Sequence, residues 1–519
     1  MEQQQEQQHM EQRSQPHPLS FRLEDNLASL RAAASKRSDV VIRWFHDPAT
    51  DRKEYALVYI EGLVDLTAIN ESLLRPLMSV LSVPDGDTAE RFSAIQNCAC
   101  AAGPTVIVED METLWQQILQ GDTVILAQGF QQGVAAGTSG GERRSIAEPT
   151  TQNVIRGPKE AFTESLRTNT SLISRRLKST KLRIENKTIG EQTQTNVSVL
   201  YLEGIADASV VREVHGRLDK IRTDGILEGG YIEELIEDAA LSPFPTIFNT
   251  ERPDAVTAGL LEGQIAIVVD GSPFVLLAPV TFFTFFDSSE DYYQRFYIAS
   301  FLRLLRFGAF FVSLLLPSLY ISVTTYHPEM LPTTLLVSLV AQREGVPLPA
   351  LIEAFLMEIT FEVLREAGVR MPKAIGSAIS IVGALVLGQA AVEAGLISAA
   401  MVIIVSFTAI SNFVIPSPNL SVTVGLFRFA LMLLGGTLGL YGVMVGLMLI
   451  CIHLASLRSF GVPYLMPVAP MVWSNLKDVF VRFPLWNMRT RPDGIAGKNR
   501  IRQKKILKPQ PPEPNPGKE

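Results

Sequence analysis

The stretch Tyr59-Ile-Glu-Gly-Leu-Val-Asp65 recurs, with small changes, as Tyr201-Leu-Glu-Gly-Ile-Ala-Asp207. The two stretches share four residues in seven at an offset of 142 positions. The same offset aligns Gly121 with Gly263, and each of these glycines closes a short apolar run. Self-similarity at one fixed offset is typical of a duplicated structural unit. The sequence therefore predicts two tandem copies of one fold in the N-terminal half.

Each copy is predicted to contain strands and helices in the same order, which makes it an α/β unit. The expected strands are residues 40–45, 55–61 and 122–128 in the first copy and 181–186, 197–203 and 264–270 in the second. Asp65 and Asp207 are suited to cap the helices that follow them, because an Asp side chain accepts hydrogen bonds from free backbone amides. Gly121 and Gly263 are suited to the left-handed residue that ends a helix. A ligand role for the two Asp residues is the alternative interpretation.

Composition suggests where the soluble half is divided. Residues 1–20 are rich in Gln, Glu and His and lack an apolar run, so we expect a disordered tail there. The first unit is expected at 21–140 and the second at 181–295, with a basic linker helix in 141–180. Acidic residues are interleaved with the cations of this linker, and no aromatic platform accompanies them. A charged linker, with a helix of about 18 residues, is therefore favoured over a surface for nucleic acid or lipid headgroups.

The C-terminal half is predicted to be an all-α, polytopic membrane domain over residues 296–475. A spanning helix needs roughly 20 apolar residues. We expect four spans, at 307–326, 374–392, 396–416 and 429–457, the last of which is long enough to be tilted, kinked or split with residues 420–434. Lys and Arg flank the first and last spans, which favours both termini in the cytoplasm. Residues 476–519 are basic and rich in Pro, so they are expected to form a disordered tail attracted to membrane lipid.

A stripe of small or polar residues marks the second predicted span. Steps of three and four residues place its members on one narrow face of a helix. Such a face lines a water-filled path or lets two helices approach closely, and the sequence leaves both interpretations open. The stripe consists of Lys373, Ser377, Ser380, Ala384, Gly388 and Ala391.

Two charged residues of the membrane half are candidates for gating or an ion path. Glu353 belongs to a predicted amphipathic helix, 347–368, where it falls among apolar residues and apart from the face that carries Glu358 and Arg365. It is either an acid satisfied by a partner or an ion-path residue. Arg428 faces a carboxylate, carbonyl groups or water if residues 420–434 lie inside the membrane, and is otherwise an interfacial anchor.

Enzyme chemistry is not indicated. The sequence contains no phosphate-binding Gly loop, no GxSxG and no HExxH motif, and its six His residues lack ligand spacing. Cys98, Cys100 and Cys451 are expected to be packing residues. We therefore predict no catalytic residues, no metal, no cofactor and no nucleic-acid partner.

Several long motifs in order resemble the A subunits of the GerA family of spore germinant receptors. The resemblance is specific over about residues 140–470 and weaker before them. The motifs are Glu148-Pro-Thr-Thr151, Asn249-Thr-Glu-Arg-Pro-Asp254, Asp270-Gly-Ser-Pro-Phe274, Arg343-Glu-Gly-Val-Pro347, Met357-Glu-Ile-Thr360 and Ser380-Ile-Val-Gly-Ala384.

The resemblance implies a subunit in the spore inner membrane, where germinant sensing triggers ion release. It implies as partners a B subunit similar to amino-acid transporters and a lipoprotein C subunit. It also implies self-association of A subunits around a cation path. Some members of the family amplify a signal instead of receiving the germinant.

An alternating-access solute transporter with a cytosolic regulatory domain is the alternative function. Such a transporter is expected to show repeats within its membrane half. No repeat of residues 307–392 is visible in 396–457, which weakens this alternative.

Overall fold

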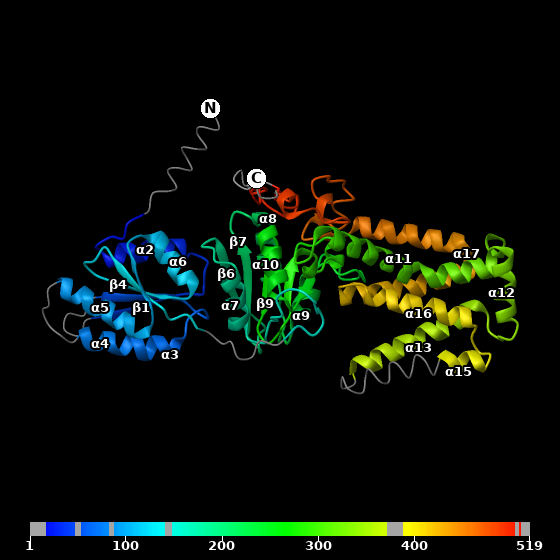
Figure 1. Cartoon of the computed structure of the whole chain (residues 1–519), viewed down its shortest axis with the longest axis horizontal. Coiled ribbons are helices and arrows are strands. Elements are labelled where there is room, and N and C mark those ends of the chain that lie inside the picture. The colour runs from blue at the N-terminus through cyan, green and yellow to red at the C-terminus, as the bar shows by residue number, and fades with distance from the viewer. Residues whose placement is uncertain are drawn as a thin grey trace, which may run out of the picture.

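Three regions follow one another along the molecule: two α/β units and a helical bundle (Figure 1). The computed structural model describes residues 17–46, 53–81, 88–140, 148–370, 388–503 and 508–509. The first unit lies at one end, the second in the middle and the bundle at the other end. The predicted fold class, a tandem α/β domain followed by an all-α membrane domain, is confirmed.

Each unit contains a five-stranded antiparallel sheet, and the two sheets have equivalent strand orders, β1-β2-β4-β5-β3 and β6-β7-β9-β10-β8. The first sheet comprises β1 (Val40–His46), β2 (Lys53–Ile60), β3 (Thr105–Val108), β4 (Thr123–Ala127) and β5 (Gly133–Ala136). The second comprises β6 (Leu182–Ile189), β7 (Thr195–Leu202), β8 (Phe248–Thr250), β9 (Ile265–Val269) and β10 (Val275–Ala278).

Helices cover both faces of each sheet, so each unit has an apolar core on either side of its strands. The first unit contains α2 (Leu23–Ala33), α3 (Leu66–Ala68), a π-helical turn (Ile69–Leu74), α4 (Arg75–Leu81), α5 (Thr88–Ala102) and α6 (Met111–Gln120). The second contains α7 (Leu166–Arg176), α8 (Ala208–Leu218), α9 (Gly229–Ile236) and α10 (Pro253–Glu262).

The predicted helix ends are present in both units. The carboxylate of Asp65 accepts hydrogen bonds from the amides of Thr67 and Ala68, and that of Asp207 accepts one from Ser209. Gly121 and Gly263 adopt φ angles of 99° and 102°, in the left-handed region. Local capping explains these four residues.

The predicted linker helix belongs instead to the second unit. Helix α7 has 11 residues and is the counterpart of α2, because a buried Asn holds the chain before each helix in the same way. Asn26 bonds both the amide and the carbonyl of Ser20, and Asn169 does the same with Thr163. The basic side chains of α7 thus lie on a packed helix, and the sequence-based linker is corrected.

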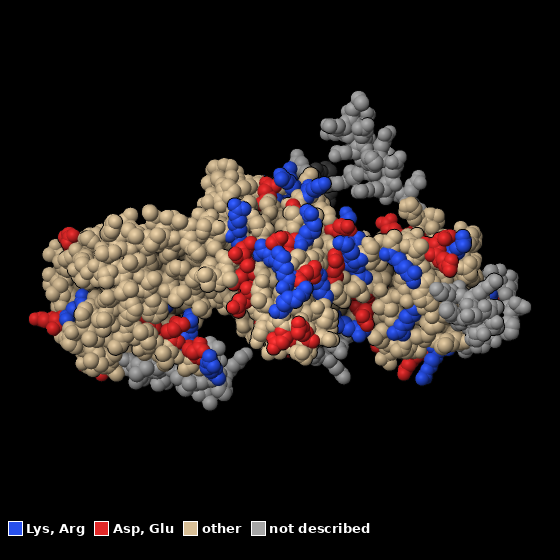
Figure 2. Space-filling view, turned by 180° about the vertical axis from the view of Figure 1, so that it is seen from behind, with Lys and Arg blue, Asp and Glu red and all other residues tan. Residues whose placement is uncertain are grey.

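The described residues of the bundle include the α-helices α11 (Phe296–Tyr326), α12 (Thr333–Arg343), α13 (Ala350–Arg370), α15 (Gly388–Glu393), α16 (Ala399–Phe413) and α17 (Pro418–Ser456). Most of the predicted span 374–392 lies outside the described residues. The face of the bundle that Figure 2 shows is mostly free of charged side chains, in contrast to the face of the second unit. By length and composition, α11 and α17 are apolar enough to cross a membrane, whereas α16 is shorter.

Helix α17 is a hairpin of two arms, 418–438 and 440–456. Gly439 has non-helical angles (φ 64°, ψ −150°). A Cβ atom on Gly442 would overlap the carbonyl oxygen of Leu434, and one on Gly446 would meet the side chain of Leu431. Residues 15 positions apart are about 22 Å apart in a straight helix, so the arms must fold back on each other. The predicted span 429–457 is therefore broken at Gly439, and residues 420–434 belong to the first arm, which agrees with the alternative of a kinked or split span.

The C-terminal segment also differs from its prediction. Residues 476–503 are not a disordered tail, because they pack against the second unit and α11. Arg502 forms an ion pair of 2.6 Å with Glu262, and Arg491 donates to the carbonyl of Leu261 at 2.8 Å. The cations that suggested a solvated tail have specific acceptors near the end of α10.

Candidate functional site

A buried ion pair crosses the helical bundle. Nη2 of Arg428, in the first arm of α17, lies 2.9 Å from Oε2 of Glu358 in α13, and both side chains are almost fully buried. Nη1 of Arg428 donates to Oγ of Ser313 at 3.4 Å, and this hydroxyl donates to Asn412 at 3.2 Å. The network thus joins α11, α13, α16 and α17.

Arg428 is buried opposite a carboxylate, as expected if residues 420–434 lie inside the membrane. Sequence reasoning missed Glu358 as the partner, because it assigned Glu358 to a polar face with Arg365. The i, i+4 pattern of charges suggested a surface face. Glu358 could have been found by another signal, because a buried arginine needs a carboxylate on a neighbouring helix.

Glu353 lies one turn and a half before Glu358 on α13. Its Oε1 accepts hydrogen bonds from the amide and hydroxyl of Ser398, both at 2.5 Å, and its Oε2 lies 4.0 Å from Nε of Arg343. Ser398 caps α16, so the carboxylate sits at a helix N-terminus, where a negative charge is stabilised. Oε1 of Glu353 is thus satisfied by Ser398, whereas Oε2 has no hydrogen-bond partner among the described residues, so its role stays a prediction.

These contacts hold α13 against α16 and α17. Removing one partner of a buried ion pair costs about 3 to 5 kcal/mol, because the other charge is left uncompensated. Oε1 of Glu358 and Nε of Arg428 have no hydrogen-bond partner among the described residues. The pair is therefore incompletely satisfied within the described part of the chain.

The predicted stripe is described in part. Gly388 is buried, and a Cβ atom on it would lie 3.6 Å from Val402 of α16. Ala391 packs against the cluster that contains Ile397 and Met401. Lys373, Ser377, Ser380 and Ala384 lie outside the described residues, so the role of the stripe stays a prediction.

One short stretch of the second unit that contacts the bundle is residues 238–246, which we call the junction segment. The ring of Phe244 stacks on that of Phe427 in α17, with centroids 4.9 Å apart. Further bonds are Ser242 Oγ to His453 Nε2 (2.8 Å), Thr423 Oγ1 to the Pro243 carbonyl (2.6 Å), Tyr464 Oη to the Pro245 carbonyl (2.6 Å) and Ser459 Oγ to the Thr246 carbonyl (2.7 Å). Five neighbouring residues thus contact both arms of the hairpin and the chain after it.

A charged cluster surrounds Arg303, which is fully buried near the start of α11. Carboxylates reach its guanidinium from three positions: Asp287 at 3.1 Å, Asp291 at 3.0 Å and Asp478 at 2.8 Å. Arg306 adds a second cation, 2.7 Å from Asp291. The C-terminal segment is therefore fastened to α11 and to the loop before it.

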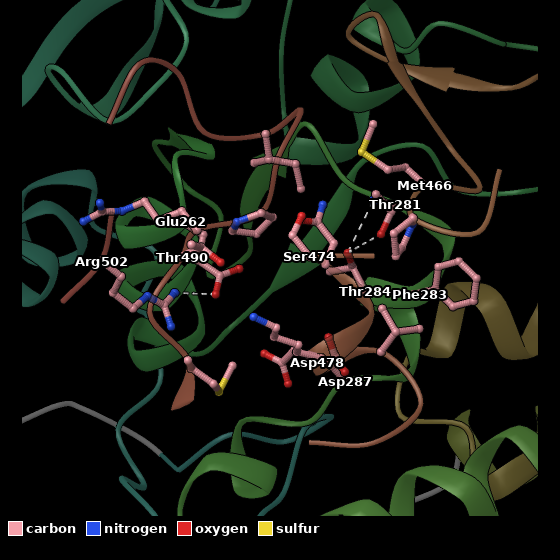
Figure 3. Close-up of a pocket in the computed structure, with 18 of the residues that line it drawn as sticks. Glu262, Thr281, Phe283, Thr284, Asp287, Met466, Ser474, Asp478, Thr490 and Arg502 are labelled. Carbon is pink, nitrogen blue, oxygen red and sulfur yellow. Dashed lines mark hydrogen bonds and ion pairs between the residues drawn. The ribbon is translucent and has the colours of Figure 1, made fainter. Parts of the chain in front are cut away.

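A polar cavity of about 100 Å³ opens beside this cluster (Figure 3). Glu262, Thr281, Ser474 and Arg502 are among the residues that line it. Burial raises the pKa of Asp287, at the cavity wall, to about 8, although the Arg303 charge opposes the shift. No group of three or more His, Cys, Asp or Glu able to hold a metal ion occurs in the part of the chain that the structure describes.

A duplicated α/β domain followed by an apolar bundle, with two helices long and apolar enough to cross a membrane, defines a membrane-anchored protein with a folded α/β domain. The family model described as Bacillus/Clostridium GerA spore germination protein matches residues 28–494. The chain therefore belongs to the GerA family and is an A subunit of a spore germination receptor. Family membership bears out the prediction that it is not an enzyme.

Named relatives agree with this assignment. Spore germination protein KA of Bacillus subtilis (strain 168) is 45% identical over 501 residues, which cover 96% of this chain and 92% of the relative. Uncharacterized membrane protein YfkQ of the same strain is 44% identical over 479 residues, 92% of each chain. Together with the two candidate spans, this likeness identifies the chain as a membrane protein.

One solved structure is similar to the soluble half. The crystal structure of the N-terminal domain of the A subunit of the Bacillus megaterium spore germinant receptor GerK3 is 36% identical, with a TM-score of 0.41. The match covers 52% of this chain and 98% of that chain.

Proposed function

We propose that this chain converts nutrient sensing into ion release across the spore inner membrane, as a channel-forming subunit that assembles with copies of itself. Its partners are a B subunit similar to amino-acid transporters and a lipoprotein C subunit. The observation that carries the proposal is the buried pair of Glu358 and Arg428, because it joins two bundle helices and is incompletely satisfied. Such a pair is suited to hold a closed state that a small input of energy can open.

The signal reaches the bundle through the junction segment. A partner that binds its ligand shifts the position of the second unit, and Phe244 transmits this shift to the first arm of α17, which carries Arg428. A change in the register of α17 against α13 separates Arg428 from Glu358. The ligand then supplies the difference in free energy between the two packing arrangements.

Both termini are on the cytoplasmic side in this proposal. Support comes from the shared apolar cluster at the base of the bundle, where Phe307 of α11 and Leu454 of α17 pack with Phe282 of the soluble half. The chain thus enters and leaves the bundle at the same end, which requires an even number of crossings.

Ion leakage from liposomes tests the gate. The purified chain is reconstituted into vesicles loaded with K⁺, and efflux is followed with an ion-selective electrode. Glu358→Gln is expected to raise basal leakage about tenfold, which corresponds to a loss of about 1.4 kcal/mol from the closed state. Exchanging the charges, with Glu358→Arg and Arg428→Glu together, is expected to restore low leakage.

The matched control lies on the same helix. Glu366 forms an exposed ion pair with Arg370, so Glu366→Gln removes a carboxylate of α13 without touching the bundle core. Its leakage should equal that of the unaltered chain. Equal leakage for Glu358→Gln and Glu366→Gln, with both proteins folded, would reject the gate, and saturable uptake of one solute would favour an alternating-access transporter.

The stripe offers a separate test of the ion path. Ser380 or Ala384 changed to Trp should alter ion release from spores while the abundance of the subunit stays normal. Unchanged release from both variants would remove the stripe from the path.

A further inference from the structure

Helix α11 is longer than the hydrocarbon core of a bilayer. Its 31 residues extend about 46 Å, whereas the hydrocarbon core is about 30 Å thick. If the span begins near Phe307, the three preceding turns lie in the headgroup layer. Their outer side carries Phe296, Tyr297 and Phe301, which are 37%, 51% and 65% exposed, while Arg303 on the inner side is buried.

Residues 480–487, which we call the interfacial strap, run beside these turns. Oγ of Ser300 accepts from the amide of Arg482 at 3.1 Å and lies 3.2 Å from its carbonyl oxygen. The rings of Trp486 and Phe296 pack edge to face with their centroids 6.0 Å apart, and the ring centroids of Phe480 and Phe307 are 5.1 Å apart. The strap therefore begins level with the start of the predicted span and runs back along the three turns that precede it.

The strap has two unlike sides. Val481, Phe483 and Leu485 are 40%, 36% and 52% exposed, whereas Arg482 between them is 3% exposed. Val481 and Phe483 thus lie on the outer side and Arg482 on the inner side, and Leu485, which begins a short 3-10 helix, is exposed as well. Arg482 turns inward, where it donates to the carbonyl of Gln294 at 3.2 Å and lies over the ring of Tyr292.

We propose that the interfacial strap is embedded in the headgroup layer of the bilayer, with Val481, Phe483 and Leu485 against lipid. The occupant is lipid because the apolar side of the strap continues the exposed aromatic side of α11, a helix long and apolar enough to cross a membrane. Aromatic residues such as Phe296, Tyr297 and Trp486 are typical of membrane interfaces. The strap thus forms a second anchor that holds the C-terminal segment, and the charged cluster around Arg303, at the membrane surface.

Site-directed labelling tests this placement. The full chain, with Cys98, Cys100 and Cys451 changed to Ala, receives one cysteine as Phe483→Cys or Leu485→Cys, and a polarity-sensitive dye is attached. In vesicles that contain brominated phospholipid, we expect the emission of either label to fall at least about twofold, since the quencher reaches only embedded groups.

The control label is attached to Lys220→Cys, at an exposed position of the second unit. Its emission should respond to iodide in the water and not to brominated lipid. Equal access of iodide to the strap labels and to the control label would overturn the proposal. Shielding of the strap labels that appears only when partner subunits are present would also overturn it, because the surface would then bind protein.

Discussion

The two α/β units share one topology but differ in what they contact. An offset of 142 residues aligns β1 with β6, β2 with β7 and β4 with β9. The same offset aligns the junction segment with residues 96–104, which end α5 and lead into β3. In the first unit this stretch covers the unit's own sheet, whereas in the second it is bonded to the membrane bundle.

The loop between α2 and β1 of the first unit contacts the second unit. The chain at Arg37 pairs with Ile184 at the edge of β6, and Nη1 of Arg37 donates to the carbonyl of Ser179 at 2.9 Å. The first unit lies at the far end from the bundle (Figure 1). The two copies therefore differ in position: the second contacts the bundle, and the first lies at the far end from it.

The largest expected difference between the copies is at Phe244. Phe244→Ala removes a buried ring from the contact with Phe427, and truncating such a ring costs about 3 to 5 kcal/mol. Its counterpart is Ala102, so Ala102→Ser should change stability by less than about 0.5 kcal/mol. Denaturant unfolding of the detergent-solubilised chain measures both. Similar losses for the two variants would contradict the assignment of coupling to the second copy alone.

Substitution of the glycines that end α6 and α10 should strain the backbone in both units but disturb the C-terminal segment only in the second. Gly121→Ala and Gly263→Ala both place a Cβ atom on left-handed backbone, which costs about 1 to 2 kcal/mol. A Cβ atom on Gly263 would also lie 2.9 Å from Cα of Ala496. Limited proteolysis should therefore release the C-terminal segment in Gly263→Ala and not in Gly121→Ala. Release in both variants, or in neither, would be the contrary result.

The capping residues should behave alike in the two units. Asp65→Ala and Asp207→Ala are each expected to cost about 1 kcal/mol, because each removes an acceptor from a helix N-terminus. Hydrogen bonds from Ser209 lower the pKa of Asp207 in the folded chain. Its contribution is thus present above the unfolded pKa of about 4 and is lost as the pH falls below it. Unfolding of the two variants between pH 3 and pH 7 checks this.

A difference in pH dependence is expected at Glu233, whose counterpart in the first unit is Arg91. Burial raises the pKa of Glu233 from 4.5 to about 7, although a hydrogen bond from Asn249 opposes this. The folded state then holds a proton that the unfolded state releases, so this residue's contribution to stability falls as the pH rises from about 4.5 to about 7. Glu233→Gln should flatten that part of the pH profile, whereas Arg91→Gln should leave its slope unchanged.

Local features of the fold could be predicted because their causes are close in sequence. Asp65 caps an amide two residues away, and Gly121 ends the helix that precedes it, so a short window contains the whole interaction. The prediction failed where identical local patterns serve different contacts. By its charges alone, the basic stretch that ends at Arg176 predicts a linker. Its place in the second unit is marked by the hydrogen bonds between Asn169 and Thr163, which correspond to no local helix motif in the sequence.

The sequence by itself determined the duplication, the helix caps and the apolar character of the bundle, because repeats, turn residues and hydropathy are properties of neighbouring residues. Only the tertiary structure decided the pairing of Glu358 with Arg428, the reversal of α17 at Gly439 and the attachment of residues 238–246 to the bundle. These partners are 70 or more residues apart or depend on close packing of two arms. Their positions follow from how whole helices fill space together, which no short window of sequence contains.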